Sequence, residues 1–211
     1  MKPMRLLSAL FLALLALPAL AADFEAGRDY HVFDEPRRTT SGDQVEVTEF
    51  FAYSCPACRR FNGPLHDWYQ QTERDVSLVR VPIPLRPQDQ AHVRAYFTAQ
   101  ALGVVDEVHD DIYVALHDQG RALVSQGEVR DFFAERGVSP EAFDEAWDSR
   151  AVQTRTRRAM ALARDYQVRS TPTVAVDGRY RITGGQAGSQ ARMIEAIEYL
   201  AGEREAARAA E

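Results

Sequence analysis

Apolar and polar residues follow two different periods along this chain, and one period gives way to the other beside its only two cysteines. Residues 45–53, "VEVTEFFAY", are rich in β-branched and aromatic side chains and follow a Gly-Asp turn signal, which predicts a strand. Alternate residues of a strand share a face, which here would carry Val47, Glu49, Phe51 and Tyr53. Beyond residue 54 the apolar residues recur at helical spacing, at Cys58, Phe61, Leu65, Trp68 and Tyr69. Cys55 is therefore predicted to lie where the strand passes into the first turn of a helix.

A second strand and a long helical stretch are predicted next. The strand runs from Asp75 to about Val81 and ends at Pro82, because a proline cannot donate a hydrogen bond to a ladder. Helical spacing then continues from about residue 88 to residue 166. Helix boundaries inside this stretch are indicated by Gly103, Gly137, the Ser139-Pro140 pair and a capping box of Ser125 and Glu128.

The strand period returns in residues 173–182. There, Asp177-Gly178 separates two short apolar runs, which is a strong signal for a β-hairpin. A last amphipathic helix follows, with Met193, Ile194, Ile197 and Leu200 on its apolar side, and the final residues, "EREAARAAE", are expected to fray. Strands on both sides of a long helical stretch predict an α/β fold with an inserted helical domain.

The first residues have the order of a secretory signal peptide, in which Lys2 and Arg5 precede an apolar run that ends at Pro18 and small residues. The run is shorter than the ~20 residues of a membrane span, although an uncleaved signal would leave a membrane anchor. We expect residues 1–21 to be a cleaved signal peptide and the mature protein to be exported. Without Lys2 and Arg5 the formal charge changes from −6 to 23 − 31 = −8, which argues against nucleic acid as a partner.

Cys55 and Cys58 form a C-x-x-C pair, with Pro56 and Ala57 between them. At a helix N-terminus, free backbone N–H groups and the helix dipole stabilise the thiolate of the first cysteine, and the second cysteine lies one turn further in. Cys55 is therefore the candidate attacking sulfur and Cys58 the candidate resolving sulfur. A structural disulfide is the alternative, although closing so small a loop removes little entropy from the unfolded chain. No metal is expected, because zinc needs two more ligands and the histidines offer no H-x3-5-H pair.

Glu49 and Pro172 are the other informative positions. If helices cover both faces of the sheet, Glu49 is buried near the cysteines, and burial raises the pKa of a carboxyl group toward neutrality. Glu49 would then accept the proton that Cys58 loses; on pattern alone, an exposed Glu49 on an outer face remains open. Pro172, in "RSTPTV", opens a strand, where the residues alone favour an ordinary trans bond.

Taken together, these motifs resemble the DsbA-type thiol:disulfide oxidoreductases of the bacterial periplasm. The resemblance is carried, in order, by "AGRDYHVF", "VEVTEFFAYSCPAC", the long helical stretch and "VRSTPTVAVDGRYRITGG". It implies a thioredoxin-like domain made of residues 22–87 and 163–211, with an inserted helical domain at residues 88–162. The site residues that it implies are Cys55 as nucleophile, Cys58 as resolving cysteine, Glu49 as buried acid, Pro172 as a cis-proline and Thr171 as a backbone partner of the substrate peptide.

The same resemblance implies a dithiol oxidase that introduces disulfide bonds into exported proteins with free cysteines. A membrane partner of the DsbB type, linked to quinone, would reoxidise the cysteine pair; no cofactor is called for, and we expect a monomer. Two alternatives remain at this point. One is a disulfide reductase or isomerase, and the other is a redox-inert folding helper that binds peptides in the Thr171-Pro172 groove.

Two positions depart from the family pattern. The best-known members have a histidine just before the second cysteine, where this chain has Ala57, so we expect the disulfide to be a weaker oxidant. Members often pair the buried acid with a lysine on the next strand, where this chain offers Arg80. A permanently charged arginine beside Glu49 would hold the carboxyl group ionised and weaken its role in proton transfer.

Overall fold

The computed structural model describes residues 24–210, so the expected signal peptide lies outside the described residues. The strands are β1 (His31–Val32), β2 (Val45–Phe51), β3 (Val76–Pro82), β4 (Thr173–Val176) and β5 (Tyr180–Thr183). The helices are α1 (Pro56–Gln71), the 3-10 turn η1 (Pro87–Asp89), α2 (Gln90–Leu102), α3 (Val105–His117), α4 (Gln126–Ala134), α5 (Pro140–Asp148), α6 (Arg150–Asp165), α7 (Gly184–Ala187) and α8 (Gln190–Ala209).

The five strands form one mixed sheet in the order β1-β5-β4-β2-β3. β2 and β3 run parallel and are connected through α1, whereas β4 pairs antiparallel with both β2 and β5. β3 is the edge strand, which allows it to include Pro82, one residue beyond its predicted end. β1, which was not predicted, adds a short strand on the other edge by pairing with β5.

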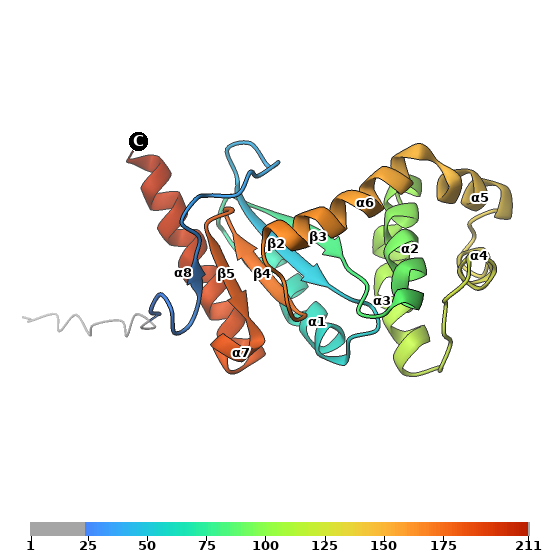
Figure 1. The fold of residues 1–211 in the computed structure, drawn as a ribbon, viewed down its shortest axis with the longest axis horizontal. Helices are drawn as coiled ribbons and strands as arrows, with labels where there is room; N and C mark the ends of the chain where they lie inside the picture. Colours follow the sequence, from blue (N-terminus) through green and yellow to red (C-terminus); the bar gives the residue numbers. More distant parts are fainter. Residues whose placement is uncertain (1–23, 211) are drawn as a thin grey trace, which may run out of the picture.

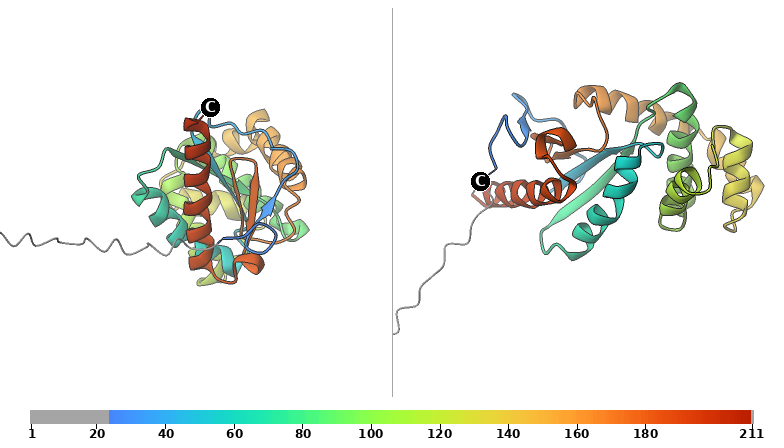
Figure 2. Two further views of the ribbon diagram at one scale, coloured as in Figure 1. Left: turned by 90° about the vertical axis from the view of Figure 1, so that its left-hand side faces the viewer. Right: turned by 90° about the horizontal axis from the view of Figure 1, so that it is seen from below.

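Helices cover both faces of the sheet (Figures 1 and 2), as the buried position of the whole of β2 requires. On one face, α1 and α8 enclose an apolar core with β2, β4 and β5; its members include Val47, Phe61, Leu65, Val174, Ile182, Met193 and Ile197. On the other face α6 runs across the sheet, and its C-terminal neighbour Tyr166 packs against Phe50. The α/β fold class predicted from the alternating periods is confirmed.

The predicted hairpin is formed, and the turn explains its residues. Asp177 and Gly178 both have positive φ, of 51° and 64°, as a two-residue turn matching the twist of the strands requires. The backbone N–H of Arg179 donates to the carbonyl of Val176 across the turn, at 3.0 Å. A Cβ atom at Gly178 would collide with the backbone of Arg37, so this position has no room for a side chain.

The helices α2 to α5 lie together at one end of the molecule, between β3 and β4 in the sequence, and α6 returns from them to the sheet (Figure 1). α6 continues to Asp165, so the expected division at residue 162 falls inside a helix rather than in a loop. The capping box of Ser125 and Glu128 at the start of α4 is confirmed. None of the helices in the described part of the chain combines the length and the apolar character needed to cross a membrane.

The prediction of a frayed C-terminal tail was wrong, because α8 continues to Ala209. Arg204 and Arg208 on its last turns both pair with the carboxylate of Asp177, which is only 5% exposed. Glu205 pairs with Arg74 after the end of α1, at 2.8 Å. The charged residues at the end of α8, which in the sequence resemble a solvent-exposed tail, therefore form ion pairs with the hairpin turn and with the loop before β3.

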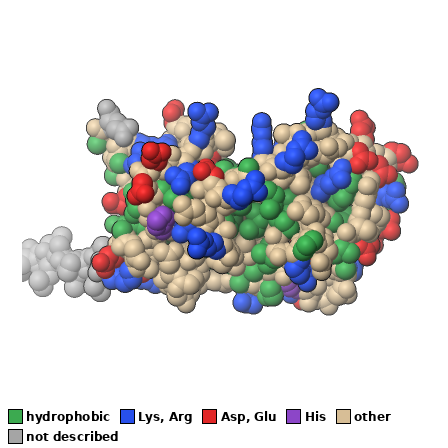
Figure 3. Space-filling view, viewed as in Figure 1, with side chains coloured by type: hydrophobic (Ala, Val, Ile, Leu, Met, Phe, Trp, Pro, Cys, Tyr) green, Lys and Arg blue, Asp and Glu red, His purple; other side chains and the backbone are tan. Residues whose placement is uncertain are grey.

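Charged groups of both signs are scattered over the face shown in Figure 3. Because Lys2 is the only lysine of the sequence, every fixed cation among the described side chains is an arginine. Many of these arginines lie close to carboxylates, such as Arg136 beside Asp111 at 2.8 Å and Arg94 beside Asp148 at 2.8 Å. An arginine that lies beside the cysteines without a carboxylate partner is therefore a candidate for binding an anionic group of a ligand.

Candidate active site

Cys55 caps the N-terminus of α1, at the junction of strand and helix that the sequence predicts. Pro56 occupies the first helical position, where its missing N–H is not needed. The backbone N–H of Cys58 points to the sulfur of Cys55, at 3.4 Å. Both cysteines are free thiols, and their exposed fractions are 7% for Cys55 and 0% for Cys58, so only the first can be reached from solvent.

The two sulfurs differ strongly in acidity. The pKa of Cys55 is lowered to about 5, first by the hydrogen bond from the side chain of Cys58 and also by backbone N–H groups of the first turn, which together outweigh its burial. The pKa of Cys58 is raised, because its proton serves that hydrogen bond and because the side chain is buried. At neutral pH the reduced pair therefore holds a thiolate at Cys55 and a thiol at Cys58.

The peptide bond between Thr171 and Pro172 is cis, as the family resemblance implied and against the expectation from the residues alone. The carbonyl oxygen of Thr171 lies 3.4 Å from the sulfur of Cys55. Pro172 directly precedes β4, which pairs with β2 and thus brings this segment beside the cysteines. The structure therefore brings together two motifs that are more than 110 residues apart in the sequence.

Glu49 is buried, with 1% of its surface exposed, which rules out the exposed alternative. It lies opposite Arg80 in the register of β2 and β3, and the two side chains form an ion pair of 3.3 Å between Oε2 and Nε. Burial raises the pKa of Glu49 to about 7, and the charge of Arg80 only partly offsets this. The arginine is present as predicted, but burial prevails, so the acid is not held fully ionised at neutral pH.

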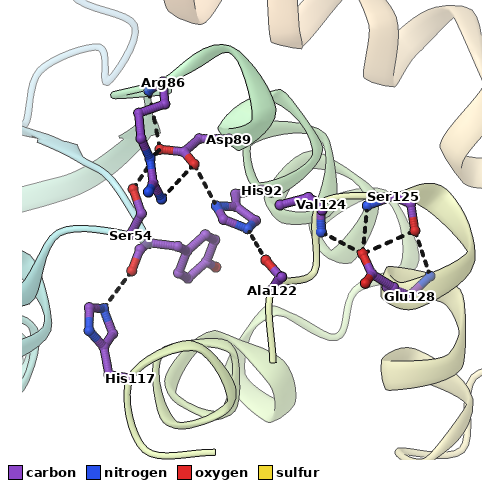
Figure 4. Close-up of polar contacts among 10 residues, drawn as sticks. Ser54, Arg86, Asp89, His92, His117, Ala122, Val124, Ser125 and Glu128 are labelled. Atoms are coloured by element: carbon purple, nitrogen blue, oxygen red, sulfur yellow. Dashed lines mark hydrogen bonds and ion pairs between the residues drawn. The ribbon is translucent and has the colours of Figure 1, made fainter. Parts of the chain in front are cut away.

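Ser54, the residue before Cys55, is hydrogen-bonded to Asp89 at the start of α2 (Figure 4), a contact that the sequence did not predict. The hydroxyl of Ser54 donates to Oδ2 of Asp89 at 2.7 Å, and Arg86 donates to the same carboxylate from its backbone and its guanidinium group. Asp89 is 1% exposed and has a lowered pKa, because the bonds from Ser54 and Arg86 outweigh the cost of burial. Only the Pro-x-Asp start of a helix could have indicated Asp89.

Tyr53, two residues before Cys55, is held by two histidines of α3. Nε2 of His117 donates to the backbone carbonyl of Tyr53 at 2.8 Å, and the phenol of Tyr53 contacts Nδ1 of His109 at 2.7 Å. Nε2 of His109 contacts the amide oxygen of Asn62 on α1 at 2.9 Å. Burial lowers the pKa of His109 to about 3, so the ring stays neutral and can accept from Tyr53 while it donates to Asn62.

Ala57 lies between the cysteines and has no side chain that could contact the thiolate. Its carbonyl accepts a hydrogen bond of 2.7 Å from the side chain of Gln190, at the start of α8. Within residues 24–210, no group of three or more histidine, cysteine or acidic side chains could hold a metal ion.

Comparison with known proteins agrees with this geometry. A family model described as the DSBA-like thioredoxin domain matches residues 46–193. Among curated proteins, the thiol:disulfide interchange protein DsbA of Pseudomonas aeruginosa is 31% identical over 188 residues, which cover 89% of this chain and 89% of that protein. The protein of the same name from Bordetella parapertussis is 34% identical over 197 residues, covering 93% and 94%.

Solved structures give the same result. The crystal structure of Pseudomonas aeruginosa DsbA is similar with a TM-score of 0.84 at 31% identity, covering 89% of this chain and 98% of that chain. The structure of the oxidoreductase DsbA from Xylella fastidiosa has a TM-score of 0.80 at 29% identity, covering 86% and 98%. The family match spans well over half of the sequence and contains the C-x-x-C pair. This chain therefore belongs to the DSBA-like thioredoxin domain family.

Proposed function

We propose that this protein introduces disulfide bonds into exported proteins by dithiol–disulfide exchange through Cys55 and Cys58. Relatives that share about a third of its residues are thiol:disulfide interchange proteins, and the chain is accordingly a protein disulfide oxidoreductase. The observation that carries the direction of the reaction is the acidic thiol of Cys55, whose pKa is about 5. A stabilised thiolate favours the reduced form of the pair, which makes its disulfide an oxidant.

The exchange begins from the oxidised pair. A client thiolate attacks the sulfur of Cys55, the bond between Cys55 and Cys58 breaks, and Cys58 leaves with the electron pair. The client is then held by a mixed disulfide at Cys55. A second client thiolate attacks the client sulfur of this bond and releases Cys55 as a thiolate, which its low pKa favours. The client loses two electrons and gains a disulfide, and the enzyme is left as a dithiol.

Glu49 is the proposed proton carrier for Cys58. The thiolate of Cys58 is unfavourable because its pKa is raised, so it must take up a proton when it leaves the disulfide and lose one when it attacks a mixed disulfide. A buried carboxyl group with a pKa of about 7 can be both donor and acceptor at neutral pH. The surrounding aromatic side chains of Tyr53 and Tyr113 have raised pKa values and cannot replace it.

Thr171 and Pro172 are the proposed contact for the client backbone. The carbonyl of Thr171 is 3.4 Å from the sulfur that would carry the mixed disulfide, so a client segment extended along residues 170–172 would have its cysteine at Cys55. A strand-like contact of this kind binds the backbone and tolerates many sequences. That tolerance fits an enzyme with several clients.

The proposed setting is the periplasm, reached through cleavage of the expected signal peptide at residues 1–21. There a quinone-linked membrane partner of the DsbB type would reoxidise Cys55 and Cys58 after each turnover. We further propose that the protein acts as a monomer and that residues 88–162 form an inserted helical domain on the thioredoxin-like part. Support comes from the family membership and from the grouping of α2 to α5 at one end of the molecule.

Oxidative folding tests this function against a reductase. The oxidised protein is mixed with a reduced, unfolded protein whose activity needs its disulfides, and the recovery of activity is followed without other oxidants. One equivalent of the protein should form about one disulfide, and Cys55→Ser should form none. A protein that fails to oxidise the client but reduces insulin disulfides would be a reductase. If the double variant Cys55→Ser, Cys58→Ser still protects unfolded proteins with unchanged function in cells, the redox-inert alternative holds.

A further inference from the structure

A groove of about 480 Å³ lies beside the cysteines and continues the proposed client path. One wall is the first part of α1, with Ala57 and Arg60, and another is the segment from Ser170 to Pro172. The third wall is formed by the glycine-rich turn that leads into α8, including Gln190. Because the carbonyl of Thr171 contacts the sulfur of Cys55, a client whose cysteine reacts at Cys55 would place its neighbouring residues in this groove.

Arg60 is the one charged side chain among the residues that line the groove. It follows Ala57 by three residues, so both lie on the same side of α1, next to the groove. Its side chain is exposed, and within the described part of the chain it has no carboxylate partner. The adjacent Arg59 differs, because it pairs with Asp118 beyond the end of α3.

This arrangement gives the groove a local charge opposite to that of the whole molecule. The formal net charge of the chain is −6, so an acidic client is repelled at long range. The other residues that line the groove are uncharged. Arg60 is therefore the one lining residue whose charge attracts an anion. Its guanidinium group can donate two parallel hydrogen bonds to a carboxylate.

We propose that Arg60 is a specificity-determining residue, which favours client segments with Asp or Glu beside the reacting cysteine. The proposal rests on the proposed function, because it concerns the same clients and the same groove. The interaction is an exposed ion pair, so its effect is a bias rather than an absolute requirement. We expect a two- to fivefold preference, which corresponds to about 0.4 to 1 kcal/mol.

Arg60 would act on the client and not on the sulfur. The groups that lower the pKa of Cys55 are hydrogen-bond partners from Cys58, Thr171 and Ala57, and Arg60 is not among the leading ones. Substitution of Arg60 should therefore change the choice among clients and leave the thiolate of Cys55 unchanged. Specificity and intrinsic reactivity can thus be measured separately.

The experiment uses three reduced peptides that contain two cysteines and differ only beside the reacting one, with Asp, Asn or Lys on each side. The second-order rate constant for single-turnover oxidation of each peptide by the oxidised, full mature protein is measured for the wild type, Arg60→Gln and Arg60→Glu. Arg59→Gln serves as the matched control, because it removes the same charge one residue away and outside the groove. Ratios between variants for one peptide cancel the intrinsic reactivity of that peptide's thiol.

The wild type should oxidise the Asp peptide two to five times better, relative to the Lys peptide, than Arg60→Gln does. Arg60→Glu should invert the preference, Arg59→Gln should retain it, and added salt should reduce it. Equal ratios in the wild type and Arg60→Glu would overturn the specificity of Arg60 while leaving the oxidase function intact. If no peptide is oxidised at all, the proposed function fails as well. If Arg60→Glu does not fold, the same ratios are compared between the wild type and Arg60→Gln, and equal ratios would then overturn the specificity of Arg60.

Discussion

Nε of Arg80 lies 3.3 Å from Oε2 of Glu49, yet both oxygens of Glu49 and this nitrogen are buried without a hydrogen bond among the described residues. Arg80 thus acts on the carboxyl group first through its charge. Strong hydrogen bonds to the charged form would have lowered the pKa, whereas here burial raises it to about 7. A carboxyl group that is half ionised near neutral pH fits the proposed transfer of protons to and from Cys58.

Glu49→Gln should slow resolution of the mixed disulfide at Cys55. In the wild type, the rate at which Cys58 resolves it should rise as pH increases through about 7, because ionised Glu49 accepts the proton. In the variant this rise should vanish, with a rate at pH 8 that is about 100-fold lower, the low end of a general-base contribution. The measurement is quenched-flow release of a mixed disulfide between pH 5 and pH 9.

Glu46→Gln is the matched control for Glu49. Glu46 lies on the same strand but on the opposite face, it is 4% exposed, and it accepts hydrogen bonds from Thr40, Ser41 and Thr48. Its substitution should leave the pH dependence of resolution unchanged. If the two variants behave alike, or if Glu49→Gln resolves at the wild-type rate, Glu49 has no role in proton transfer.

Ala57→His should make the disulfide more oxidising. A protonated imidazole beside the thiolate of Cys55 adds a hydrogen bond to a charged group, worth about 1.5 to 3 kcal/mol, to the reduced form. This corresponds to an increase of about 30 to 60 mV in the reduction potential. Ala57→Gln, which adds size without charge, is the control and should shift the potential less. A potential that stays constant or falls in Ala57→His would refute this explanation.

The stability of the reduced protein should depend on pH through Cys55. Its pKa falls from 9.0 to about 5 on folding, so between these values the unfolded chain binds one more proton and stability rises with pH. Glu49 acts in the opposite sense between 4.5 and about 7, because the folded state keeps its proton. We expect the Glu49 contribution to be the same in the reduced and oxidised forms, so that it cancels in their difference.

Denaturant unfolding of both redox forms at several pH values measures this difference. The free energy of unfolding of the reduced form, minus that of the oxidised form, should increase from pH 5 to pH 8 by up to about 1.4 kcal/mol per pH unit. Below pH 5 it should level off. A difference that stays constant across this range would mean that the thiolate of Cys55 is not stabilised by folding.

Asp89→Ala should destabilise the protein more than Ser54→Ala. The first change leaves the half-buried hydroxyl of Ser54 without its acceptor and removes the ion pair with the exposed Arg86, which together cost about 1 to 3 kcal/mol. The second removes one bond and leaves the pair of Asp89 and Arg86 intact. In urea unfolding, the double variant Ser54→Ala, Asp89→Ala should therefore be no less stable than Asp89→Ala alone. If the losses in unfolding free energy of the two single variants add up in the double variant, the two side chains do not interact.

The sequence predicted those features that local chemistry determines. The strand-to-helix junction at Cys55, the Asp177-Gly178 turn and the capping box of Ser125 follow from periodicity and from the conformations that these residues favour. The strand period left Glu49 either buried or on an exposed outer face, and only the structure, with helices on both faces of the sheet, shows that it is buried. The cis bond at Pro172 did not follow from its neighbours, and only family resemblance indicated it.

Features that depend on distant partners could not be predicted in the same way. Asp89 and His117 look like ordinary polar residues of helices, and their contacts with Ser54 and Tyr53 span 35 and 64 residues. The last turns of α8 likewise resemble a solvated tail until Asp177 is placed beside them. Such pairs are set by packing of the whole chain, which periodicity does not encode.

The reduction potential of the Cys55–Cys58 pair tests the central claim most directly. It is obtained by equilibrating the mature protein with glutathione buffers at pH 7 and by alkylating the free thiols. We expect a value well above the about −220 to −260 mV of the glutathione pool, because the thiolate of Cys55 favours the reduced form. A value near the about −270 mV of thioredoxin would contradict the oxidase and identify a protein that reduces its partners.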